Sequence, residues 1–240
     1  MYRVPNNWDT GDTTTTKGVV DTDIGFIQEF YPLYIEAAKL TVIIAFWGIL
    51  FSLVVGIICA TVLYYRIPFV KRIVSFYIEL SRNTPLLVQL FFLYYGLPKI
   101  GVIWSSEICA IVGLTFLGGS YMTEAFRSSL EAIDKVQLEC AKSLGFNSLL
   151  TMKEIILPQA LSLSVPGLCA NVIFLIKETS VVSAIALADL MYVAKDLIGI
   201  YHNTDEALLM LVIAYLIILL PISVVASLLE RRLRYAGFGH

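Results

Sequence analysis

Residues 40–65 read LTVIIAFWGILFSLVVGIICATVLYY and contain no Asp, Glu, Lys or Arg. An α-helix needs about 20 mostly apolar residues to cross the hydrocarbon core of a bilayer. This stretch therefore predicts a membrane-spanning helix, Leu40–Tyr65. The rest of the 240-residue chain agrees, because 58% of its residues are hydrophobic, 15% are charged and the mean hydropathy is +0.80. Soluble domains average about 45–50% apolar and about 25% charged residues, so the composition excludes an ordinary soluble globule.

Four further apolar stretches predict membrane-spanning helices: Ile78–Leu97, Cys109–Thr123, Ile155–Ile176 and Ala207–Leu229. Another apolar run, Val181–Ala188, is too short to cross a bilayer alone. The sequence thus predicts an all-α polytopic membrane helix bundle with five transmembrane helices.

Basic residues concentrate in alternate segments between these predicted spans. They are Arg66, Lys71 and Arg72 after the first span, Arg127, Lys135, Lys142 and Lys153 after the third, and Arg231, Arg232 and Arg234 after the fifth. Cytoplasmic loops of membrane proteins carry an excess of Lys and Arg. We therefore expect a multi-pass protein of a cell membrane, with its N-terminus outside and its C-terminus inside.

The regions that flank the spans have different characters. Residues 1–36 predict a polar extracytoplasmic arm followed by an interfacial helix, on which Ile27, Phe30, Tyr31 and Tyr34 recur at helical spacing. Residues 37–234 form the predicted transmembrane domain, and residues 235–240 form a cytoplasmic tail.

The cytoplasmic loop at residues 134–158 is patterned. Leu138, Ala141 and Leu144 share one helical face, and Gly145 follows as a helix stop. Asn147 can cap a second helix, Ser148–Leu157, which Pro158 ends or kinks. The apolar face could seat in the groove of a partner protein or lie on the inner leaflet, and the pattern alone does not decide between them.

This loop resembles the Glu-Ala-Ala loop of ATP-binding-cassette importer permeases. The matching residues are Glu139, Cys140, Ala141 and Gly145, followed after nine residues by Ile155, Leu157 and Pro158; Cys140 stands where the family usually has Ala. Two other stretches resemble the polar amino acid branch of that family, which takes up histidine, glutamine, arginine or glutamate. They are Arg82–Gln89, with Asn83 in place of the usual Gly, and Lys177–Ser183, followed by Ala188, Asp189 and Leu190.

The resemblance implies a type I importer-like fold and a set of partners. Two permease subunits, identical or paralogous, would sit on a dimer of cytoplasmic ATPases, and an extracytoplasmic binding protein would deliver a polar amino acid. The residues implied to couple the permease to the ATPase are Glu139, Cys140, Ala141, Leu144, Gly145 and Pro158. Because the chain has no Gly-x-x-x-x-Gly-Lys-[Ser/Thr] motif, we expect no ATPase activity and no cofactor of its own, with ATP bound by the partner.

Polar residues at membrane depth are the candidate substrate pathway, because they are costly there unless they face the protein interior or a wet cavity. They are Gln89, Asn171, Glu178, Thr179, Ser180 and Ser183. Hydrogen bonding between helices is the alternative role for Gln89 and Asn171. An ion pair with Lys177 is the alternative for Glu178, and Glu79–Arg82 and Glu124–Arg127 are expected to be surface pairs.

Other classes of protein are less well supported. The four cysteines lack Cys-x-x-Cys spacing and the two histidines lack neighbouring ligands, so no metal site is expected. The net charge of −2 provides no basic field for nucleic acid. A stand-alone secondary carrier or channel is the alternative function, but the first, third and fifth spans lack the mid-membrane carboxylates that coupling ions commonly need.

Overall fold

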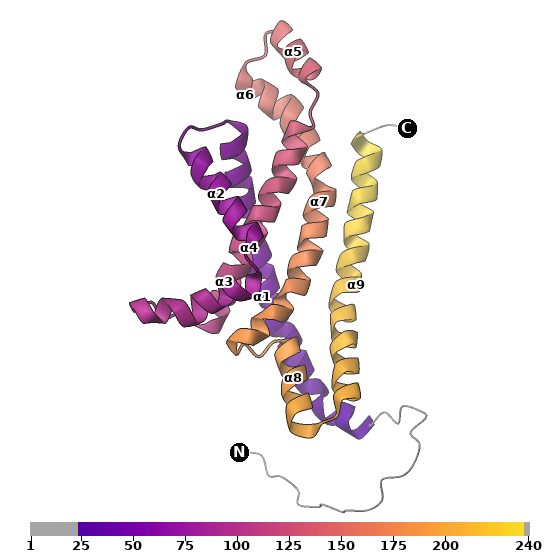
Figure 1. Ribbon diagram of the computed structural model, residues 1–240. Helices are drawn as coiled ribbons and strands as arrows, with labels where there is room; N and C mark the ends of the chain where they lie inside the picture. The colour runs from indigo at the N-terminus through magenta and orange to yellow at the C-terminus, as the bar shows by residue number, and fades with distance from the viewer. Residues whose placement is uncertain (1–23, 238–240) are drawn as a thin grey trace, which may run out of the picture.

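The computed structural model describes residues 24–237, and the part of the chain it describes is built from helices and short connections, without a strand. The residues of the predicted polar arm before Ile24, and residues 238–240, lie outside the described residues. Four helical segments within residues 24–237 are long and apolar enough to cross a membrane: Ile24–Tyr64, Ser106–Glu131, Ser148–Ile185 and Thr204–Arg232. Figure 1 shows them as a bundle of roughly parallel and antiparallel helices.

The first helix, α1 (Ile24–Tyr64), is longer than predicted. Its 41 residues give a length of roughly 60 Å, about twice the hydrocarbon core of a bilayer. The segment expected to be a separate interfacial helix is continuous with the first span. Phe30 and Tyr34 are buried there against α8 (Leu190–Tyr201) and α9 (Thr204–Gly237), and the Tyr34 hydroxyl donates a hydrogen bond of 2.8 Å to a backbone carbonyl of α9.

The second predicted span, Ile78–Leu97, is wrong as a single helix. The structure has α2 (Val70–Asn83), then α3 (Leu86–Phe91), a π-helical turn (Phe92–Gly96) and a 3₁₀ turn (Leu97–Ile100). Pro85 lacks a backbone N–H and disfavours a helical residue before it. Thr84 is accordingly extended, at φ −114° and ψ 126°. From this break α3 leaves sideways from the bundle (Figure 1).

The centre of the bundle is the contact between α1 and α4 (Ser106–Glu131). A Cβ atom on Gly56 of α1 would lie 2.5 Å from the Cβ of Met122 on α4, so only glycine allows the two backbones to approach this closely. Core side chains from α1, α3, α4 and α7 surround this contact, among them Ile44, Leu90, Leu114, Met122 and Leu175.

The second half of the chain connects the two ends of the bundle. After α5 (Lys135–Ser143) and α6 (Ser148–Thr151), a π-helical turn (Met152–Ile156) leads into α7 (Leu157–Glu178) and a 3₁₀ segment (Thr179–Ile185). Pro158 was expected to end or kink the second helix of the loop. It does not end that helix, because Ser148–Ile185 is one helical segment, but the π-helical turn lies just before Pro158, and such a distortion is often found where a helix is kinked. The loop 134–158, the start of α2 and the end of α9 lie at one end of the bundle, and α8 and the start of α1 lie at the other (Figure 1).

Candidate coupling loop and substrate pathway

The loop 134–158 has the local geometry that the sequence predicts. The Asp134 side chain accepts a hydrogen bond of 2.9 Å from the Val136 N–H and begins α5. At the other end the Phe146 N–H donates to the Ala141 carbonyl (2.9 Å) and the Gly145 N–H donates to the Lys142 carbonyl (3.0 Å). This pair of bonds is the Schellman motif, which needs a left-handed residue, and Gly145 has φ 81°. The predicted glycine stop is confirmed.

The second helix of the loop begins at the predicted cap. The Asn147 side chain accepts a hydrogen bond of 2.8 Å from the Leu150 N–H, as an N-cap residue does. Two caps and one glycine turn therefore define a compact helix-turn-helix beyond the ends of α4 and α7 (Figure 1).

The outward surface of this loop differs from the expected one. Ala141 was placed on an exposed apolar face, but it is only 1% exposed and packs inside the loop. Leu144, predicted on the same face, is 76% exposed as expected, and the loop also exposes Val136 and Leu149. The face that a partner could contact therefore combines these three residues with the exposed Glu139 and Cys140.

Polar side chains lie at the base of the loop, where it joins α4 and α7. The Gln159 amide on α7 donates a hydrogen bond of 2.7 Å to the Gln137 side chain on α5. Near the end of α4, Arg127 pairs with Glu124 at 2.8 Å and with Glu131 at 3.1 Å, so the expected Glu124–Arg127 pair is present. The Gln159–Gln137 bond is a direct side-chain link between the loop and α7, whereas the Arg127 pairs stabilise the end of α4 itself.

Gln89 of α3 holds the break between α2 and α3. In an uninterrupted helix the Ser81 carbonyl would accept the N–H of residue 85, which is a proline. The Gln89 amide nitrogen takes that role, donating to the Ser81 carbonyl at 3.0 Å and to the Thr84 carbonyl at 2.9 Å. The structure therefore gives Gln89 a backbone-supporting position at the break.

A cleft of about 460 Å³ lies beside this break. Its lining includes Arg82, Asn83 and Thr84 from the α2–α3 junction, with Tyr121 and Glu178 opposite them. The Arg82 guanidinium lies 5.1 Å from the centroid of the Tyr121 ring and 4.0 Å from the Glu124 carboxylate. The expected Glu79–Arg82 pair is not among the ion pairs of the described residues. The cleft thus presents a cation, an anion and an aromatic ring together.

The other predicted pathway residues lie elsewhere in the bundle. The Asn171 amide donates to the Tyr121 carbonyl at 3.1 Å, a bond between α7 and α4. Thr179 is buried and donates to the Ile176 carbonyl, whereas Ser183 accepts a bond of 3.0 Å from the Lys195 ammonium and Ser180 is half-buried. Of the six, Glu178 alone is in the lining of the cleft.

Asp189 is a buried acid that is not among the predicted pathway residues. It is fully buried at the start of α8, where its side chain accepts a hydrogen bond of 3.0 Å from the Tyr192 N–H. Its second carboxyl oxygen has no partner within the described residues. Burial raises the pKa of this carboxyl from 3.8 to about 6, because removal from water disfavours the charged form.

Comparison with known proteins identifies relatives of this chain. Residues 52–235 match the family model described as "Binding-protein-dependent transport system inner membrane component". The chain is 35% identical over 174 residues to the probable amino-acid ABC transporter permease protein PatM of Vibrio harveyi, which covers 70% of this chain and 77% of that protein. It is 34% identical over 174 residues to the probable glutamine ABC transporter permease protein GlnP of Bacillus subtilis, covering 72% and 80%.

Solved structures agree with these relatives. A chain from the "Crystal structure of an amino acid ABC transporter with histidines" has a TM-score of 0.82 and 30% identity, with 88% of this chain and 98% of that chain covered. The MetNI methionine ABC transporter, in an inward-facing conformation, shares the fold at a TM-score of 0.70 and 19% identity, covering 86% and 98%. The chain therefore belongs to the family of binding-protein-dependent transport system inner membrane components, the permeases of ATP-binding-cassette transporters.

Proposed function

We propose that this chain is the permease subunit of an ATP-driven importer of polar amino acids in a bacterial cell membrane. The observation that carries the proposal is the capped helix-turn-helix at residues 134–158, which extends past the ends of α4 and α7 and exposes Val136, Leu144 and Leu149. An exposed apolar surface on a rigid element suits docking into a groove of a partner. The names of the relatives, which include amino-acid and glutamine permeases, support this class of substrate.

In this proposal the chain spans the membrane five times, with the broken α2–α3 segment as the second crossing. The loop 134–158 then faces the cytoplasm and the N-terminus faces the exterior. Two permease subunits pair, a dimer of ATPases docks on the two loops, and a binding protein delivers substrate from outside. When ATP closes the ATPase dimer the loops approach each other, because ATP favours the conformation to which it binds better, and the pathway changes from inward-open to outward-open.

The cleft beside Pro85 is the part of the pathway that we assign to substrate. A zwitterionic amino acid needs a cation for its carboxylate and an anion for its ammonium group. Arg82 and Glu178 lie in the lining of the same cleft and supply both. A guanidinium can bind a carboxylate through two parallel hydrogen bonds, so Arg82 would orient the substrate and Glu178 would bind its amine.

The test is uptake by the reconstituted complex. Vesicles that contain the chain, its ATPase and its binding protein should accumulate a labelled polar amino acid only with ATP. Glu178→Gln should lower uptake at least tenfold, whereas the matched control Glu79→Gln, an exposed residue outside the cleft, should not. Equal uptake by both variants would remove the cleft from the pathway.

Ion-driven transport is the alternative outcome. Uptake by vesicles that contain the chain alone, driven by an ion gradient without ATP, would instead support a secondary carrier and overturn the importer proposal.

A further inference from the structure

Residues 66–72, which comprise the turn after α1 and the first three residues of α2, form a segment that we call the basic hairpin. Its depth in the membrane follows from α1. Lys39, which pairs with Glu36 at 2.7 Å, is the last charged residue of α1 before Arg66. The uncharged helix between them is roughly 40 Å long at 1.5 Å per residue. A hydrocarbon core of about 30 Å with part of each headgroup region fills that length. Arg66 therefore lies at the level of the lipid headgroups, directly after Tyr64 and Tyr65.

The basic hairpin carries three positive charges that form no ion pair with the side chains that the structure describes. Arg66, Lys71 and Arg72 are all exposed, and none of them is in an ion pair found among residues 24–237. The next acidic residue along the chain is Glu79. The hairpin therefore presents uncompensated positive charge at headgroup depth.

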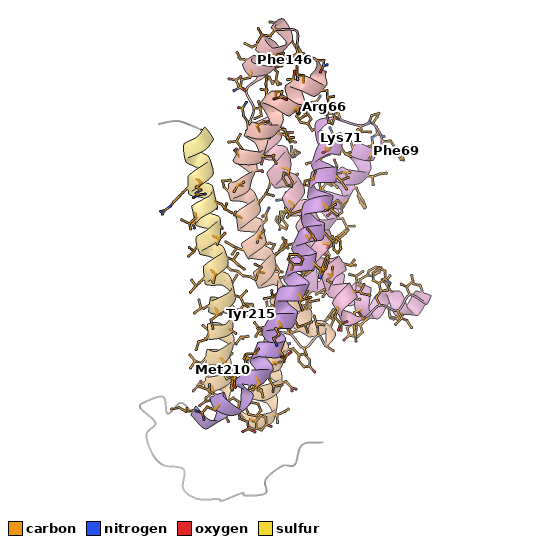
Figure 2. All side chains as sticks on the ribbon, turned by 180° about the vertical axis from the view of Figure 1, so that it is seen from behind. Arg66, Phe69, Lys71, Phe146, Met210 and Tyr215 are labelled. Carbon is orange, nitrogen blue, oxygen red and sulfur yellow. The ribbon has the colours of Figure 1, made fainter. Side chains whose placement is uncertain are left out.

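The backbone of the basic hairpin is strained in a way that exposes an aromatic ring. Arg66 has φ 51° and Phe69 has φ 69° with ψ −57°, and a positive φ costs free energy for residues with a Cβ. Phe69 is 76% exposed, and its side chain provides no cap for α2. Figure 2 shows Phe69 at the outer edge of the turn, with Arg66 and Lys71 beside it. The strained backbone therefore does not bury the Phe69 ring within the protein. Insertion of this ring into the bilayer interface would offset the free-energy cost of the strain.

An apolar stripe continues from Phe69 along α2. Ile73 and Phe76 follow at helical spacing on the same face and are 55% and 66% exposed. Val74 and Ile78 face the other way and are buried. A ligand that covers both the charges and the stripe must join an anionic group to hydrocarbon.

We propose that the basic hairpin is a binding site for an anionic phospholipid, with the phosphate bound by Arg66, Lys71 and Arg72 and the acyl chains lying along Phe69, Ile73 and Phe76. Basic residues next to a membrane span attract anionic lipid, and guanidinium groups bind phosphate oxygens through paired hydrogen bonds. The bound lipid fixes the start of α2, and therefore the position of the α2–α3 break. The lipid belongs to the leaflet at the end of the bundle where the loop 134–158 lies (Figure 1).

Native mass spectrometry of the purified full-length chain in detergent tests the site, with phosphatidylglycerol as the anionic probe and phosphatidylcholine as the neutral one. We expect the chain to bind phosphatidylglycerol more tightly, and R66Q/K71Q/R72Q to lose about fivefold in affinity for each charge removed. The matched control K135Q/K142Q/K153Q removes the same number of charges from the loop 134–158 and should still bind phosphatidylglycerol more tightly than phosphatidylcholine. The single variant K71Q, expected to lose about fivefold, provides the same test if the triple variant does not fold.

Three results would overturn the proposed lipid-binding site. They are equal affinity for the two lipids in the unmodified chain, equal loss of affinity in the hairpin variant and the control, and an unchanged lipid preference in a folded hairpin variant. The hairpin variant is also tested for ATPase binding in phosphatidylcholine nanodiscs. Loss of ATPase binding there, with lipid preference unchanged, would assign the surface to a protein partner instead.

Discussion

The contact between α1 and α4 is tight enough that one methyl group should disturb it. On Gly56 a Cβ would lie 2.5 Å from the Met122 Cβ and 3.1 Å from a backbone carbon of the same residue. Ordinary carbon–carbon contacts are about 3.5–4.0 Å. In Gly56→Ala, therefore, α1 and α4 must move apart by about 1 Å at the centre of the bundle.

The magnitude of the effect is best measured against a matched glycine. Overpacking of a core costs about 1–3 kcal/mol, but alanine also gains about 1 kcal/mol over glycine inside a helix. Gly199 lies inside α8, and a Cβ there meets no atom within 4 Å. Gly199→Ala therefore has the same gain in helix stability as Gly56→Ala but no steric clash. The free energy of unfolding of Gly56→Ala should be lower than that of Gly199→Ala by about 1–3 kcal/mol.

Thermal unfolding of the purified chain in detergent measures this difference. A thiol-reactive fluorogenic dye reports unfolding, because Cys59 and Cys109 are buried in the folded bundle. At about 2–4 °C per kcal/mol for a chain of this size, the Tm of Gly56→Ala should lie several degrees below that of Gly199→Ala. A Tm for Gly56→Ala at or above that of Gly199→Ala would refute the close-packing argument.

Substitutions at three other positions have direct outcomes. In Gly145→Ala the added Cβ meets no atom within 4 Å, but alanine disfavours the φ of 81° at this position. The substitution should lower the free energy of unfolding by about 1 kcal/mol and lower substrate-stimulated ATP hydrolysis by the reconstituted complex. Gly145→Asn should cost less, because asparagine tolerates this conformation. Gln89→Leu leaves the Ser81 and Thr84 carbonyls without their donor and should lower the free energy of unfolding by about 1–3 kcal/mol, measured as a fall in Tm. The Asp189 carboxyl has its pKa raised to about 6 in the folded chain, so it binds a proton more tightly than in the unfolded chain, and stability should fall as pH rises from about 4 to 6. Asp189→Asn should flatten that dependence in Tm measurements across this range, and an unchanged slope would contradict the assignment.

Hydropathy identified the long spans because each of them is a continuous apolar helix. The same reasoning missed the break at Pro85, since a sliding average of hydropathy ignores whether a residue has a backbone N–H. The proline and the Gln89 that compensates it are both visible in the sequence. Their pairing across the break is a three-dimensional fact, because it depends on Gln89 folding back to the Ser81 and Thr84 carbonyls.

The candidate site was only partly predictable for a similar reason. Caps and the glycine stop of the loop 134–158 are local features, so the sequence predicts them residue by residue. The burial of Ala141 depends on how the loop folds back on itself, and the position of Arg82 over Tyr121 depends on elements that are distant in the chain. Periodicity along one helix could identify a shared face on α5, but it could not indicate which neighbour covers that face.

Docking of the loop 134–158 on the ATPase can be measured directly through Cys140. Cys140 is exposed on α5, whereas Cys59 and Cys109 are buried, so a benzophenone maleimide can be attached there in a Cys169→Ser background. Illumination of the assembled complex should cross-link Cys140 to the ATPase subunit. A Cys140→Ser/Ile200→Cys control, labelled on exposed Ile200 at the opposite end of the bundle, should not cross-link. An intact complex in which labelled Cys140 gives no cross-link to the ATPase, or the control gives an equal one, would contradict the account.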